Sequence, residues 1–130
     1  MSEVRPVLLI VDDEVRILTA LRRVLRSERY EILTAETPAE ALRLLDERSV
    51  DLVLSDHKMP GMSGLELLAR VSRKQPSAGR ILITGWTEEV PPEELAAVGV
   101  CALLPKPWDN AELKATLRAA LGSDAARRLG

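Results

Sequence analysis

Five short apolar runs recur along this chain, and each is separated from the next by an amphipathic stretch. The runs lie near residues 6–11, 30–35, 50–55, 80–84 and 100–104. Apolar runs of this length are typical of strands buried on both faces, and helical periodicity between them is typical of repeated βα units. The pattern therefore predicts an α/β fold with a five-stranded parallel sheet and five helices. A chain of 130 residues suits one such domain.

Local signals indicate where several of the helices begin. Thr37, Ser63 and Asp109 each precede a helical stretch and are followed three residues later by a glutamate, which is the capping-box pattern. The fourth helix is expected to be short or irregular, because Pro91 and Pro92 remove two backbone donors and disfavour helical geometry before them.

Composition excludes several classes of function. The chain is 46% hydrophobic and 29% charged with a formal net charge of -2, which disfavours nucleic-acid binding by this chain alone. No apolar stretch approaches the roughly 20 residues that span a bilayer, and the first residues lack a secretory segment, so we expect a cytoplasmic protein without membrane contact. The lone cysteine, Cys101, lies in an apolar run and is expected to be a buried structural thiol.

Acidic residues stand at the ends of two predicted strands. Asp12 and Asp13 follow the first apolar run, and Asp56 follows the third. A doubly wound sheet allows several strand orders, and the order 2-1-3-4-5 would bring these carboxylates together at one edge. The same order would place Thr84 and Lys106 on that edge. The sequence therefore predicts an acidic pocket for a divalent cation.

These residues occur in a familiar order. The motifs are Asp12-Asp13, Asp56 followed by Met59-Pro60-Gly61, Thr84-Gly85, and Lys106-Pro107-Trp108. Together they resemble the receiver domain of bacterial two-component response regulators, the CheY-like superfamily. The resemblance implies a flavodoxin-like (βα)5 sandwich of strand order 2-1-3-4-5, with the receiver at residues 1–122 and a short C-terminal tail at 123–130.

The resemblance also implies a metal site. Asp13 and Asp56 would supply direct ligands to Mg2+, the backbone carbonyl of Lys58 would supply another, and Asp12 would act mainly through a bound water. A hard cation with oxygen ligands relieves the repulsion between closely placed carboxylates.

The implied activity is phosphorylation rather than enzymatic turnover. Asp56 would accept a phosphoryl group from a sensor histidine kinase or a phosphotransfer protein. Lys106 would pair with Asp56 and then with a phosphoryl oxygen, and Thr84 would donate a hydrogen bond to the new phosphate. The chain would catalyse its own phosphorylation and dephosphorylation. The modification would alter contacts with a downstream protein or a fused output domain. Leu103 stands where many receivers carry an aromatic residue, which leaves the route to the output open.

Other interpretations remain open at this point. Taken singly, the acids could be a helix start favoured by the helix dipole, and Lys106 an ordinary surface charge. A pseudo-receiver would keep the fold and work without phosphorylation. A flavodoxin-like electron carrier or a haloacid-dehalogenase-like phosphatase could use the same sheet edge, although Asp12-Asp13-Glu14 lacks the Asp-x-Asp spacing of the latter. Beside the site, His57 is expected to be an exposed loop side chain, and Trp86 either shields the aspartyl phosphate or is a loop aromatic.

Overall fold

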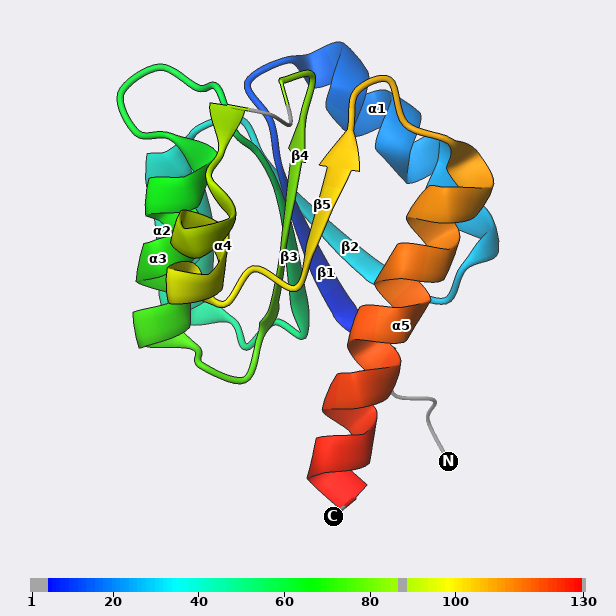
Figure 1. Ribbon diagram of the computed structural model, residues 1–130. Coiled ribbons are helices and arrows are strands. Elements are labelled where there is room, and N and C mark those ends of the chain that lie inside the picture. Colours follow the sequence, from blue (N-terminus) through cyan, green and yellow to red (C-terminus); the bar gives the residue numbers. More distant parts are fainter. Residues whose placement is uncertain (1–4, 87–88, 130) are drawn as a thin grey trace.

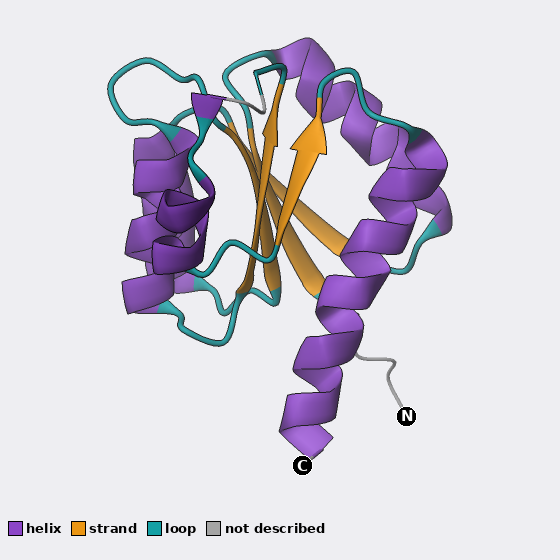
Figure 2. Cartoon of the chain, viewed as in Figure 1, coloured by secondary structure: helices purple, strands orange, loops and turns teal. Residues whose placement is uncertain are grey.

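The computed structural model describes residues 5–86 and 89–129, so the N-terminal segment discussed above lies outside these ranges. Five parallel strands form one sheet in the order β2-β1-β3-β4-β5, which confirms the predicted architecture. The strands are β1 (Val7–Val11), β2 (Glu31–Ala35), β3 (Leu52–Asp56), β4 (Gly79–Thr84) and β5 (Ala102–Pro105). Figure 2 shows the sheet as the central layer.

Helices cover both faces of the sheet. They are α1 (Val15–Val24), continued by the 3-10 turn η1 (Leu25–Ser27), α2 (Pro38–Glu47), α3 (Gly64–Lys74), α4 (Pro92–Val98) and α5 (Asn110–Leu129). Figure 1 shows α1 and α5 on one face, and α2, α3 and α4 on the other. The fourth helix spans 7 residues, as the two prolines predict.

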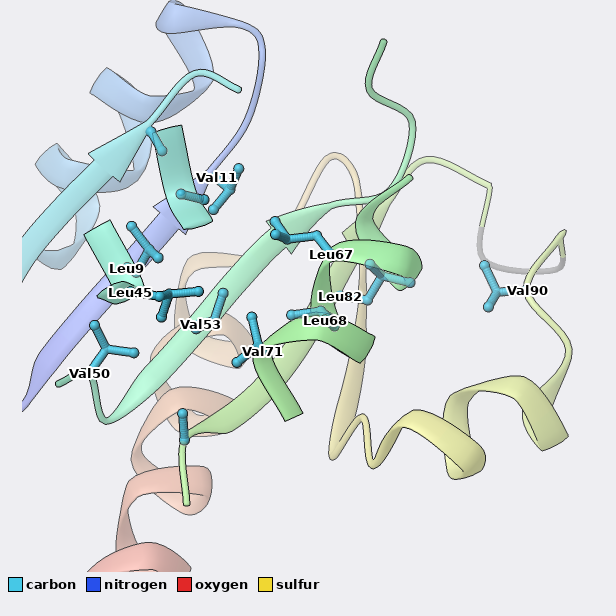
Figure 3. Close-up of a cluster of buried hydrophobic side chains, with 13 residues drawn as sticks. Leu9, Val11, Leu45, Val50, Val53, Leu67, Leu68, Val71, Leu82 and Val90 are labelled. Carbon is cyan, nitrogen blue, oxygen red and sulfur yellow. The ribbon is translucent and has the colours of Figure 1, made fainter. Parts of the chain in front are cut away.

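The core lies in two layers, one on each side of the sheet. Successive strand residues point to opposite faces, so Leu8 and Ile10 pack toward α1 and α5, while Leu9 and Val11 pack toward α2 and α3. The second of these layers is drawn in Figure 3. β3 is buried along its whole length. Burying each such leucine or valine contributes about 1.5–3 kcal/mol.

The predicted helix starts are present. The Thr37 hydroxyl accepts a hydrogen bond from the Glu40 amide at 3.1 Å, the Ser63 hydroxyl accepts one from the Glu66 amide at 3.1 Å, and the Asp109 carboxylate accepts one from the Glu112 amide at 2.8 Å. Each cap satisfies an amide that the first helical turn leaves without a partner. These caps fix where the loops from the carboxyl edge of the sheet enter α3 and α5.

The prediction of a buried Cys101 is wrong, and the last helix is longer than its apolar pattern. Helix α5 continues to Leu129, beyond the apolar pattern that ends near Leu121, so most of the stretch expected as a tail is helical and projects past the sheet (Figure 1). The alanines and arginines there favour helix strongly enough to continue through Gly122, whose cost is about 1 kcal/mol. Cys101 is exposed, because β5 begins one residue later at an open edge of the sheet. No helix among the described residues is long and apolar enough to span a bilayer.

Candidate functional site

The carboxyl ends of β1 and β3 bring three acids together. Val11 pairs with Ser55 in the parallel register, so Asp12 and Asp56 follow at the same level of neighbouring strands. One carboxylate oxygen from each of Asp12, Asp13 and Asp56 lies within 4.8 Å of the other two. Asp12 is 1% exposed and Asp56 is 6% exposed, whereas Asp13 faces solvent. The cluster therefore has a buried floor and an open side.

Lys106 joins the two buried acids. Its Nζ lies 2.9 Å from Oδ2 of Asp12 and 3.0 Å from Oδ1 of Asp56. The β4–β5 register, in which Thr84 pairs with Pro105, places the lysine just beyond the end of the last strand. The sequence predicts the pair with Asp56, whereas the shared bond to Asp12 depends on distances that strand order alone does not supply.

The electrostatics of this group reflect burial and close charges. Burial raises the pKa of Asp56; hydrogen bonding to Lys106 lowers it, the charge of Asp12 raises it, and the net direction is upward. Burial lowers the pKa of Lys106, but its bonds to Asp12 and Asp56 outweigh this, so the net direction is again upward. Lys106 therefore stays protonated, and the surroundings of Asp56 destabilise its ionised form.

Thr84 ends β4 at the same edge and is buried. Its hydroxyl oxygen accepts a hydrogen bond from the backbone N–H of Trp86 at 3.1 Å. Trp86 is 58% exposed, and the Lys58 ammonium lies 5.4 Å from the centroid of its ring. The same ammonium forms an ion pair with Glu89 at 3.0 Å. The Lys58 side chain thus connects the loop after β3 with the loop after β4.

Three features of the site were not predicted from the sequence. The Asp12 carboxylate accepts a hydrogen bond from the Glu14 amide at 2.9 Å, which orients it. A Cβ atom on Gly64 would collide with the backbone carbonyl of Asp56, so the loop after β3 packs tightly against the end of that strand. His57 is half-buried rather than exposed, and its Nδ1 is a buried atom without a hydrogen-bond partner among the described residues. The glycine in Ser63-Gly64 was the available sequence signal for the close packing.

The donor set fits a small divalent cation. Carboxylate oxygens are the ligands that Mg2+ prefers, and one or two protein carboxylates with waters usually complete its coordination. Asp12, Asp13 and Asp56 supply such oxygens within reach of one ion. The carbonyl of Lys58 as a further ligand stays a prediction.

Comparison with known proteins agrees with this architecture. A family model described as the response regulator receiver domain matches residues 8–118. The hydrogenase transcriptional regulatory protein HoxA of Cupriavidus necator is 37% identical over 125 residues, which cover 93% of this chain and 25% of that protein. The transcriptional regulatory protein GlrR of Escherichia coli is 39% identical over 120 residues, which cover 91% of this chain and 27% of that protein. The chain thus spans about a quarter of the length of these relatives.

Solved structures give the same result. The signal receiver domain of an HD domain-containing protein from Pseudomonas fluorescens superposes with a TM-score of 0.84 at 38% identity, covering 98% of this chain and 96% of that one. The response regulator TrrA from Thermotoga maritima, solved in complex with Mg2+ and BeF, superposes with a TM-score of 0.80 at 34% identity, covering 89% of this chain and 99% of that one.

Proposed function

Because the chain belongs to the response regulator receiver domain family of two-component signalling, we propose that it accepts a phosphoryl group on Asp56 from a histidine kinase or a phosphotransfer protein. The observation that carries the proposal is the buried contact of Lys106 with both Asp12 and Asp56 beside an exposed third acid. A structural salt bridge needs one acid for one lysine. A cluster of three acids with one lysine has a net negative charge. A divalent cation would offset this charge and allow an anionic phosphoryl group to approach.

The acidic cluster would hold Mg2+. Asp13 and Asp56 would bind it directly, with the Lys58 carbonyl, and Asp12 would bind it mainly through water. When bound, the ion supplies positive charge that offsets the carboxylates and screens the phosphoryl oxygens. The open side at Asp13 gives access from solvent.

Asp56 is the nucleophile in this scheme. One of its carboxylate oxygens forms a bond to phosphorus while the phosphorus–nitrogen bond of the donor phosphohistidine breaks, and the imidazole nitrogen keeps the bonding electron pair. Lys106 already contacts this carboxylate at 3.0 Å and would move with little displacement to a phosphoryl oxygen. The Thr84 hydroxyl would turn from the Trp86 amide toward the phosphate and donate a hydrogen bond to it.

A cavity next to the acidic site suggests where the phosphodonor protein would dock. A largely apolar cavity of about 480 Å³ lies between α1 and the start of α5, lined by Ile17, Lys106, Pro107 and Trp108. An apolar surface beside the reactive lysine favours docking of a partner helix that carries the phosphohistidine. Phosphorylation would then shift the loops after β3 and β4 and alter contacts with a downstream protein or a fused output domain.

Intact mass after incubation with a small phosphodonor tests the proposal. We expect one phosphoryl adduct on the wild-type chain with Mg2+ and none in EDTA. Asp56→Asn should give none in either buffer, whereas Asp46→Asn should behave as wild type, because Asp46 is an exposed acid paired with Lys74 on α2 and α3.

The alternative is a pseudo-receiver that binds partners without phosphorylation. It would be favoured if the folded wild-type chain gave no adduct with a phosphodonor or with a histidine kinase and did not bind Mg2+. An adduct that persists in Asp56→Asn would also overturn the proposed acceptor.

A further inference from the structure

A second polar pocket lies away from the acidic site. It is a cavity of about 280 Å³ at the end of α1, lined by Arg5, Arg22, Arg26, Glu28, Tyr30 and Ile32 together with an apolar wall. Three arginines therefore line one cavity in a chain whose formal net charge is -2. A chain with a small net negative charge would not be expected to gather three positive side chains around one cavity.

The fold brings these arginines together from two segments. Arg22 and Arg26 are four residues apart across α1 and η1, which places them on the same side of the helix. Arg5 joins them because β1 pairs with β2 from its first residue, and the Glu31 amide donates to the Pro6 carbonyl at 2.9 Å. Arg22 is positioned by a hydrogen bond from Nη2 to the Ile32 carbonyl at 3.3 Å.

The single acid in the pocket lining is already paired. Both carboxylate oxygens of Glu28 accept hydrogen bonds from Arg118, at 2.7 Å from Nε and 2.9 Å from Nη2. Hydrogen bonding to Arg118 holds the pKa of Glu28 below its usual value. Lys114 lies beside the same corner, 3.2 Å from the Ser27 hydroxyl. Glu28 therefore neutralises Arg118, and among the described residues that line the pocket no other acid offsets the charges of its three arginines.

The pocket lies at the amino ends of the strands, and the acidic site lies at their carboxyl ends. Arg5 and Tyr30 precede β1 and β2, whereas Asp12 follows the end of β1. A strand of five residues separates the edges by about 16 Å, which exceeds the Debye length of about 8–10 Å at physiological salt. The acids of the phosphorylation site therefore do little to offset the positive charge of the pocket.

We propose that this arginine pocket binds the phosphate groups of a small phosphorylated molecule. The planar guanidinium fork matches two oxygens of a phosphate at once, and several forks around one cavity favour an anion with more than one phosphoryl group. Burial raises the pKa of Tyr30, so its hydroxyl remains protonated and is a further donor. The cavity is smaller than most drug-sized pockets and suits a diphosphate group rather than a whole cofactor.

Calorimetric titration of the full chain with inorganic pyrophosphate in EDTA tests this. EDTA removes divalent metal that could hold phosphate at Asp56. We expect saturable binding of one pyrophosphate, weaker binding of inorganic phosphate, and amide chemical-shift changes in 15N spectra confined to residues 22–32 and their neighbours. Arg22→Gln/Arg26→Gln should weaken binding at least about tenfold, since charge-assisted hydrogen bonds are lost.

The matched control is Arg43→Gln/Arg70→Gln, which removes the same charge from α2 and α3 on the other face of the sheet. It should bind within about twofold of wild type at a given salt concentration. The proposal would be overturned if both double variants bound pyrophosphate equally weakly, or if the amide chemical-shift changes were centred on Asp56. It would also be overturned if a folded wild-type chain showed no saturable binding of pyrophosphate. Binding to phosphatidic acid vesicles without binding to pyrophosphate would also overturn it, in favour of a membrane surface.

Discussion

We expect the Lys106→Met substitution to destabilise the metal-free protein by about 3 kcal/mol at neutral pH. Lys106 Nζ lies 2.9 Å from Asp12 and 3.0 Å from Asp56. At an effective dielectric constant of about 20, each attraction amounts to about 5.5 kcal/mol. Desolvation of the charges offsets much of this, and removing one partner of a buried ion pair typically costs about 3–5 kcal/mol. We take the lower value because the lysine side chain remains 18% exposed.

Urea unfolding followed by circular dichroism, in EDTA at pH 7.5 and 5.5, measures this loss. Without Lys106, the pKa of Asp56, which burial already raises, rises further above its unfolded value. The folded variant then binds more protons than the unfolded one, so its deficit relative to wild type shrinks as the pH falls. Mg2+ should also reduce the deficit.

The control for this experiment is Lys74→Met. Lys74 forms an exposed ion pair with Asp46 at 2.6 Å, and exposed pairs contribute at most about 1 kcal/mol. Equal losses in the two variants, or a Lys106→Met deficit that is independent of pH, would refute the argument that burial gives the Lys106 contacts their strength.

Two further predictions concern the loops around the site. Gly64→Ala should lower the free energy of unfolding by about 2–3 kcal/mol, because the new methyl group meets the Asp56 carbonyl in a packed region. The control is Gly122→Ala on an exposed helix, where the new methyl group meets nothing within 4 Å; this change should be neutral or stabilise by up to about 1 kcal/mol. Thermal unfolding of both variants measures the contrast. If the indole shields the aspartyl phosphate from water, Trp86→Ala should shorten the lifetime of the phosphoryl adduct, measured by its loss over time. The Lys58 ammonium, 5.4 Å from the centroid of the ring, holds the indole beside the loop after β3. An unchanged lifetime would assign Trp86 to the loop surface alone.

The parts of the fold that could be predicted from the sequence are those set by short-range patterns. Apolar runs marked the strands, and the caps at Thr37, Ser63 and Asp109 marked helix starts, because each depends on residues a few positions apart. The strand order came from the resemblance, and it then placed the five site residues at one edge. Cys101 was misjudged because an apolar run does not reveal which strand is at the edge of the sheet.

Contacts between distant segments do not follow from such short-range patterns. The bond from Lys106 to Asp12 spans 94 positions and that from Arg118 to Glu28 spans 90. The arginine pocket likewise combines Arg5 with a helix end more than fifteen residues later. Such contacts depend on side-chain reach within the folded sheet, and the sequence contains no local signal for them.

The hydrogen bond between the Thr84 hydroxyl and the Trp86 amide affects how far phosphorylation would shift the balance between the two loop arrangements. On the proposed mechanism, Thr84 gives up an acceptor role worth about 0.5–1.5 kcal/mol and gains a bond to a charged phosphate worth about 1.5–3 kcal/mol. The difference of about 1–2 kcal/mol corresponds to roughly a tenfold change in the ratio of the two loop arrangements. A fraction of unphosphorylated molecules would therefore already adopt the active arrangement, and the output would be graded, with a measurable basal level.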